Sequence, residues 1–226
     1  MVPLAALAPS WTPYRYCFDN PINLTDPSGL WESTDVTLNA DGTYKVVGGR
    51  LDGDKNIYVV KDGKRTGEII GQSLFEKSFY NEDFKGDNKW MGSIDTKSVE
   101  GASFLVNKIY TNTPSLLKYA ANWEDYNFKS SGYDKSKGSP TNYAYRGSEF
   151  SSDIYASARD FGNIGAGYVA GRGELNWGGT KFIFERFQAK QNGNIFGSGF
   201  ESEQTVQGER LGWEHGNKQW MSSLSR

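Results

Sequence analysis

The hydrophobic pattern of the chain changes its period near residue 98, and this change constrains the fold more than any other feature. Before it, apolar and polar residues alternate as they do in strands, for example over residues 36–38. Two β-rich runs also flank Asp62-Gly63, and an Asp-Gly pair between such runs is a strong hairpin signal. We therefore predict a small antiparallel β meander within residues 31–98.

From residue 99 onward the spacing becomes helical. Phe104, Leu105 and Ile109 would share one helix face, and Pro114 suits the first position of a further helix. A loop rich in Ser, Gly and Lys is expected over 129–140, with longer helices over 152–170, 178–190 and 202–214. The predicted fold class is α+β, with a small N-terminal antiparallel β meander followed by a mainly helical C-terminal domain. The expected division is 1–30, 31–98 and 99–226.

Composition excludes several kinds of site. The 226 residues contain one cysteine, Cys17, and one histidine, His215, which excludes a disulfide framework, a thiolate zinc site and a multi-histidine metal site. No cofactor is implied, and a metal ion is left open. No apolar run approaches the roughly 18 residues of a membrane helix, so no membrane partner is expected. The opening residues lack a basic start and are not predicted to form a signal peptide. The net charge of −2 provides no overall attraction to nucleic acid.

The most specific stretch of the chain lies within residues 14–30. It contains the pattern Pro-x4-Asp-Pro-x-Gly-Leu, formed by Pro21, Asp26, Pro27, Gly29 and Leu30. An ordinary series of Asn-Pro and Asp-Pro turns is the alternative explanation. The pattern resembles the end of the core shell of Rhs (rearrangement hotspot) proteins.

This resemblance implies that Leu30 is the self-cleavage point of a longer precursor, with catalysis supplied by shell residues. Residues 1–30 would then be a remnant of the Rhs core, residues 31–98 a β-rich linker or pre-toxin region, and residues 99–226 the toxin. The implied partners are the Rhs core shell and a cognate immunity protein. The toxin would be secreted and delivered into a neighbouring cell.

A second unusual feature is a face of small and polar residues in the C-terminal part. If this stretch is helical, Asp160, Asn163, Gly167 and Gly171 lie on one face. Glycine costs about 1 kcal/mol relative to alanine within a helix, so something must offset its repeated use here. A ligand or another backbone approaching closely would do so. The spacing therefore leaves two interpretations open, a reactive pocket and a tight helix–helix contact.

The same residues resemble the polymorphic toxin type 44 domain, over about residues 120–216. The shared pattern Asp-x-Gly-Asn-x-x-x-Gly is formed by Asp160, Gly162, Asn163 and Gly167, with a Tyr-x-x-Lys element ending at Lys129 and a downstream Gln188. This chain departs from the family pattern at Asn127, where an Asp is expected, and Asp125 is the alternative acidic partner. The type 44 domain is predicted to be an RNA-cleaving toxin.

RNA cleavage without a metal needs a base, an acid and a cation for the phosphate. Residues 129–226 contain 12 Lys and Arg against 10 Asp and Glu, so any basic patch must be focused. His215 has an alternative role as a helix-terminal cap. The candidate catalytic residues are Asp160, Asn163, His215, Arg146 and Lys129, and the candidate substrate-binding residues are Gly162, Gly167, Gln188 and Tyr168.

Two other toxin activities compete with the ribonuclease interpretation, which we favour. Tyr145-Arg146-Gly147 and Glu201-Ser202-Glu203 resemble the arginine strand and Glu-x-Glu turn of ADP-ribosyltransferases. A cell-wall (peptidoglycan) hydrolase would instead use Asp160 or Glu174 as its acid.

Overall fold

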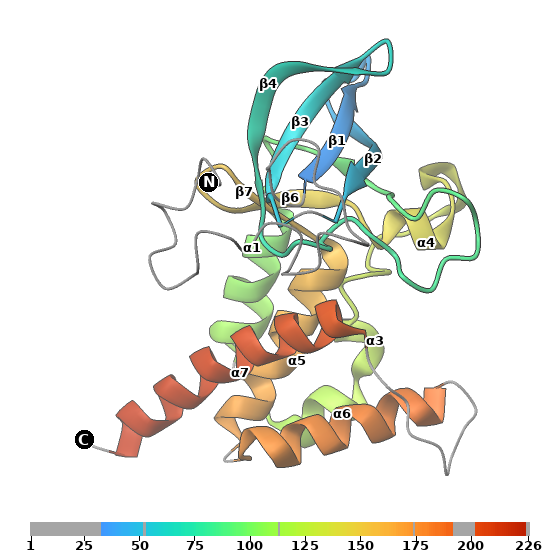
Figure 1. Cartoon of the computed structure of the whole chain (residues 1–226). Helices are drawn as coiled ribbons and strands as arrows, with labels where there is room; N and C mark the ends of the chain where they lie inside the picture. The colour runs from blue at the N-terminus through green and yellow to red at the C-terminus, as the bar shows by residue number, and fades with distance from the viewer. Residues whose placement is uncertain (1–32, 52, 113, 174, 192–201, 225–226) are drawn as a thin grey trace, which may run out of the picture.

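A β-barrel and a group of helices make up the part of the chain that the structure describes. The computed structural model describes residues 33–51, 53–112, 114–173, 175–191 and 202–224. Figure 1 shows the barrel above the helices, with α5 descending from the barrel and α7 crossing it.

Seven strands form the barrel. They are β1 (Ser33–Leu38), β2 (Tyr44–Arg50), β3 (Asn56–Lys61), β4 (Lys64–Ser73), β5 (Ser93–Ile94), β6 (Gly147–Ser151) and β7 (Ile154–Ser157). Their order around the closed barrel is β1-β2-β5-β6-β7-β4-β3. Strand pairs β1–β3, β5–β6 and β4–β7 are parallel, and the other four neighbouring pairs are antiparallel.

The predicted hairpin at Asp62-Gly63 is confirmed. Strands β3 and β4 are antiparallel and the turn between them has φ of 50° at Asp62 and 74° at Gly63. Two consecutive residues with positive φ characterise the type I′ turn, whose twist matches that of the flanking strands.

The prediction of a small N-terminal meander is wrong. The sheet is a closed seven-stranded barrel, and β6 and β7 come from the region that we expected to be mainly helical. These strands have five and four residues, and β5 has two, so none is long enough to show a clear period in the sequence. Closure also depends on pairing between segments far apart in the chain, which local patterns do not report.

Apolar side chains from strands and loops fill the barrel. Val36, Ile57, Phe79 and Ile94 are completely buried. Trp90, which packs with them, makes an edge-on contact with Tyr80 at 5.2 Å between ring centroids.

The described helices lie between β5 and β6 or follow β7. They are α1 (Glu100–Phe104), the π-helix η3 (Leu105–Tyr110), α2 (Leu116–Ala121), α3 (Trp123–Tyr126), the 3-10 helix η4 (Lys135–Lys137), α4 (Pro140–Tyr143), α5 (Ala158–Arg172), α6 (Trp177–Gln191) and α7 (Glu203–Leu224). Helix α5 begins six residues later than predicted because β7 occupies the preceding residues. Among the described helices, none is long and apolar enough to cross a membrane.

Candidate functional site

The glycine face of α5 packs directly against a second glycine face on α7. A Cβ atom added at Gly212 of α7 would lie 2.8 Å from both the carbonyl carbon of Ile164 and the amide nitrogen of Tyr168. A Cβ added at Gly167 of α5 would lie 2.7 Å from the carbonyl carbon of Glu209. Both distances are too short for real Cβ atoms, so the two helix backbones touch only because these positions are glycine.

Asp160 lies in the first turn of α5, at one end of this contact between α5 and α7, which we call the α5–α7 seam. Its side chain is completely buried. Its carboxylate accepts hydrogen bonds from the Ser157 amide at 2.9 Å and from Gln204 Nε2 at 2.8 Å. The Ser157 side chain in turn accepts from the Asp160 amide, which completes a capping box at the start of α5. Burial raises the pKa of Asp160, and hydrogen bonds from Ser157, Ser78 and Gln204 oppose this shift. The carboxylate therefore joins the end of β7 to α5 and α7.

The neighbouring Arg159 joins α5 to α7 and to the segment between α4 and β6. Its guanidinium donates to the Tyr145 hydroxyl at 2.6 Å, to Gln204 Oε1 at 2.9 Å and to Thr205 Oγ1 at 2.8 Å. Sequence reasoning did not select Arg159 or Gln204, and it named Tyr145 only beside Arg146 in the resemblance to an arginine strand. Arg commonly makes forked polar contacts, but the sequence alone does not show which partners its guanidinium contacts.

Asn163, the second residue of the predicted centre, is 4% exposed and lies against Gly208 of α7. Its Nδ2 has no hydrogen-bond partner within the described residues. Of the two interpretations left open by the sequence, the geometry found is the tight helix contact. The catalytic roles of Asp160 and Asn163 stay predictions, and the structure places both side chains inside a packing seam.

Arg146 and Lys129 lie close together on the other side of α5. Arg146 Nε donates to Glu100 Oε1 at 2.7 Å, and its terminal nitrogens donate to the carbonyls of Phe128 at 2.7 Å and Lys129 at 3.0 Å. Because its donors have protein acceptors, this guanidinium already has a structural role beside the start of β6. The Lys129 side chain passes over Gly162, 3.7 Å from the position that a Cβ would take there.

Several predicted residues lie outside the part that the structure describes. These are the motif residues Pro21, Asp26, Pro27, Gly29 and Leu30, the side chain of Gln188, and the competing candidates Glu174 and Glu201.

The fold brings together two of the predicted residues, the exposed His215 and the buried Tyr168. The exposed His215 ring contacts Tyr110 and Tyr168 edge-on, with ring centroids 5.0 and 5.3 Å apart. Burial raises the pKa of Tyr110 to about 12, so its hydroxyl keeps its proton at neutral pH. Burial also raises the pKa of Tyr168, and the nearby positive charge of Arg172 opposes that shift. Sequence reasoning missed Tyr110 and Arg172, because nothing local relates η3 to α7.

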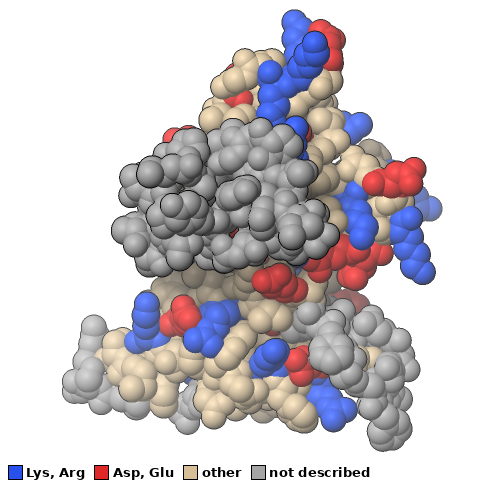
Figure 2. Space-filling model, in the orientation of Figure 1, with Lys and Arg blue, Asp and Glu red and all other residues tan. Residues whose placement is uncertain are grey.

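Positive charge near His215 comes from more than one helix. Arg172 follows Tyr168 by one turn of α5, and the exposed Lys218 follows His215 by three residues on α7. On the described surface seen in Figure 2, basic and acidic side chains are interleaved. The His215 cluster, consisting of Tyr110, Tyr168, Arg172 and His215, thus combines a titratable ring with a local cation.

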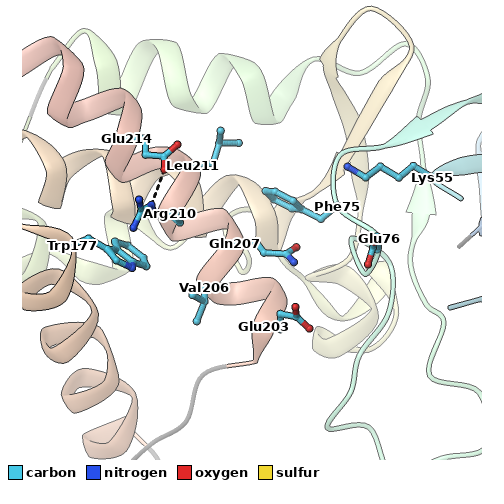
Figure 3. A pocket seen from close by; sticks show the side chains of 10 residues that line it. All are labelled: Lys55, Phe75, Glu76, Trp177, Glu203, Val206, Gln207, Arg210, Leu211 and Glu214. Atoms are coloured by element: carbon cyan, nitrogen blue, oxygen red, sulfur yellow. Dashed lines mark hydrogen bonds and ion pairs between the residues drawn. The ribbon is translucent and has the colours of Figure 1, made fainter. Parts of the chain in front are cut away.

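A groove of about 580 Å³ runs between the barrel and the outer face of α7 (Figure 3). Its lining residues come from the loop before β3, the segment after β4, the start of α6 and one face of α7. They are Lys55, Phe75, Glu76, Trp177, Glu203, Val206, Gln207, Arg210, Leu211 and Glu214. The recurrence of α7 residues at three- and four-residue intervals was visible in the sequence, but the facing wall was not.

The described residues contain no group of three or more His, Cys, Asp or Glu side chains that could hold a metal ion. Comparison with known proteins finds no matching family model, no matching curated protein and no matching solved structure.

Proposed function

We propose that this chain carries the effector tail of an Rhs-type polymorphic toxin, freed from its precursor by cleavage after Leu30. The complete Pro21-to-Leu30 motif supports this proposal. The first described strand begins at Ser33, so a cut after Leu30 leaves every described element intact. The Rhs core shell and a cognate immunity protein are the partners that follow from it, and a neighbouring cell is the destination.

We infer that the tail cleaves RNA at the His215 cluster. The observation that carries this inference is the exposed imidazole packed against two tyrosine rings, one of which, Tyr168, feels the positive charge of Arg172. An imidazole titrates near neutral pH, which suits proton transfer. Aromatic rings such as Tyr110 can stack on bases, and Arg172 can pair with phosphate oxygens.

The reaction follows from these roles. Neutral His215 takes the proton of the ribose 2′-hydroxyl, and the 2′ oxygen forms a bond to phosphorus. The bond from phosphorus to the 5′ oxygen breaks, and the leaving oxygen takes a proton from the Tyr110 hydroxyl. The proton that His215 gained then passes through solvent to the Tyr110 oxygen, which restores both groups. The products are a 2′,3′-cyclic phosphate and a free 5′-hydroxyl. Arg172 offsets the negative charge of the phosphorane transition state.

Incubation of the purified full chain with total RNA in the presence of EDTA tests this proposal. We expect fragments that end in cyclic phosphates, and a loss of about 10²–10⁴-fold in cleavage rate for His215→Ala. Gln219→Ala, one turn further along α7, is the matched control and should cleave at the unaltered rate. Full activity of His215→Ala would remove this residue from the mechanism.

The same preparation separates the competing activities. Transfer of label from NAD to protein would replace the ribonuclease proposal with ADP-ribosyl transfer. Toxicity in an unprotected host with intact, unlabelled RNA and protein would redirect attention to the cell wall.

A further inference from the structure

The groove along the outer face of α7 lies apart from the His215 cluster and plays no part in the proposed reaction. Its volume of about 580 Å³ falls within the usual range of ligand sites. One wall belongs to the barrel and the other to α7, and such junctions between structural units commonly bind ligands. In Figure 3 the acidic side chains Glu76 and Glu203 line one end of the groove, and Trp177 and Arg210 line the other.

The cations in the groove already have partners within the protein. Lys55 Nζ donates to the carbonyl of Leu74 at 3.2 Å. Arg210 Nε donates to Glu214 Oε1 at 2.7 Å, and the guanidinium lies 5.1 Å from the Trp177 ring centroid. Neither side chain can turn to an anionic ligand without losing these contacts.

Among the described residues, the end of the groove that holds Glu76 and Glu203 has more carboxylates than cations. Within the described residues Glu76 has no hydrogen bond or ion pair. Glu203 Oε2 lies 3.7 Å from Lys77 Nζ, but the same ammonium also bonds to Glu82. Among the described residues at this end, the three carboxylates Glu76, Glu203 and Glu82 face the two ammonium groups of Lys55 and Lys77. One negative charge is left unmatched, so the complementary group is a cation.

Apolar surface lies between the charged ends. Phe75 of the barrel wall faces Val206 and Leu211 on α7, and Leu211 is 36% exposed. A ligand that satisfies the carboxylates and covers these residues must carry a cation on an apolar stem. The side chains of Arg and Lys have this form.

We propose that this groove binds a basic, partly apolar segment of a partner protein, with an Arg or Lys side chain between Glu76 and Glu203. This assignment does not depend on the reaction that the chain catalyses.

Fluorescence polarisation with the full chain tests the assignment. The probe is a short labelled peptide in which arginine, leucine and glycine alternate, and glutamate replaces arginine in the comparison peptide. We expect binding of the basic peptide only, weakening as salt rises. Glu76→Gln and Glu203→Gln should each weaken it about two- to fivefold, and the double variant about tenfold. Glu68→Gln, on the exposed part of β4, removes the same charge elsewhere and should leave affinity unchanged.

A second variant keeps the test independent of the carboxylates. Val206→Arg fills the groove and supplies the cation from within the chain, so it should abolish binding. Equal affinity of the double variant and the unaltered chain would overturn the proposal, as would the absence of binding. Displacement of the peptide by an equal concentration of spermidine would also overturn it, since the occupant would then be a free polyamine.

Discussion

Replacement of Gly212 by alanine is the sharpest test of the α5–α7 seam. The new methyl group would lie 2.8 Å from two backbone atoms of α5, about 0.6 Å short of ordinary van der Waals contact at 3.4 Å, and nearer still to the Ile164 carbonyl oxygen. Backbone atoms of a helix cannot rotate away as a side chain can, so α7 must shift. Overpacking of this kind costs typically 1–3 kcal/mol, and the rigid neighbour places Gly212→Ala at or above the upper value.

The intrinsic preference of alanine for helices offsets about 1 kcal/mol of this cost. A net loss of about 2 kcal/mol in the free energy of unfolding remains, which corresponds to roughly 4–8 °C in the melting temperature of a chain of this size. Urea unfolding and thermal unfolding, both followed by circular dichroism, measure the two quantities.

Gly178→Ala is the matched control. Gly178 lies in the exposed first turn of α6, where the nearest atom to an added Cβ is 3.5 Å away, and alanine there should be neutral or stabilising. If Gly212→Ala were as stable as Gly178→Ala, the two helices would not touch through their backbones. The packing argument would then fail.

Three further perturbations follow from the structure. Asp160→Ala leaves the Ser157 amide and two side-chain donors without their buried acceptor, and should lower the free energy of unfolding by about 3 kcal/mol; an unchanged urea midpoint would contradict the capping role. Gly63→Ala forces a side chain into φ of 74° and should cost about 1 kcal/mol, measured in the same way, and no loss would exclude the I′ turn. Burial raises the pKa of Tyr110 and Tyr145 to about 12, so the folded state holds protons that the unfolded state releases near pH 10. Stability should therefore fall as pH rises from about 10 to 12, by about 1.4 kcal/mol per pH unit for each tyrosine, and Tyr110→Phe should remove one such contribution; an equal slope in that variant would refute the assignment.

Local elements were the part of the fold that could be predicted. The Asp62-Gly63 hairpin depends on two residues that accept positive φ. Helices α5, α6 and α7 could be predicted from apolar spacing and from the glycine-containing turns that end helices, both of which are local features of the sequence. The closed barrel could not be predicted in the same way. Strands β6 and β7 are too short to display a period, and they pair with strands about 50 to 85 residues earlier in the chain.

The same distinction between local and long-range features applies to the candidate sites. The glycine spacing on α5 correctly marked an unusual face, because a bare backbone is rare in a helix whatever approaches it. A matching signal existed in Gly208, Gly212 and Gly216, which repeat at four-residue intervals on α7. Together, the glycine faces of α5 and α7 favour a close contact between the two helices. No such signal linked Tyr110 to His215, or Glu76 to Glu203.

By itself the amino-acid sequence determined where backbone can turn, where helices run, which chemical groups exist, and that one histidine is the sole imidazole. The tertiary structure decided that Asp160 joins β7, α5 and α7, that the exposed His215 packs against Tyr110 and Tyr168, and that carboxylates from the segment after β4 and from α7 line one groove. The physical reason is range: turns and helices depend on contacts within a few residues, whereas burial and site geometry depend on which distant segments meet.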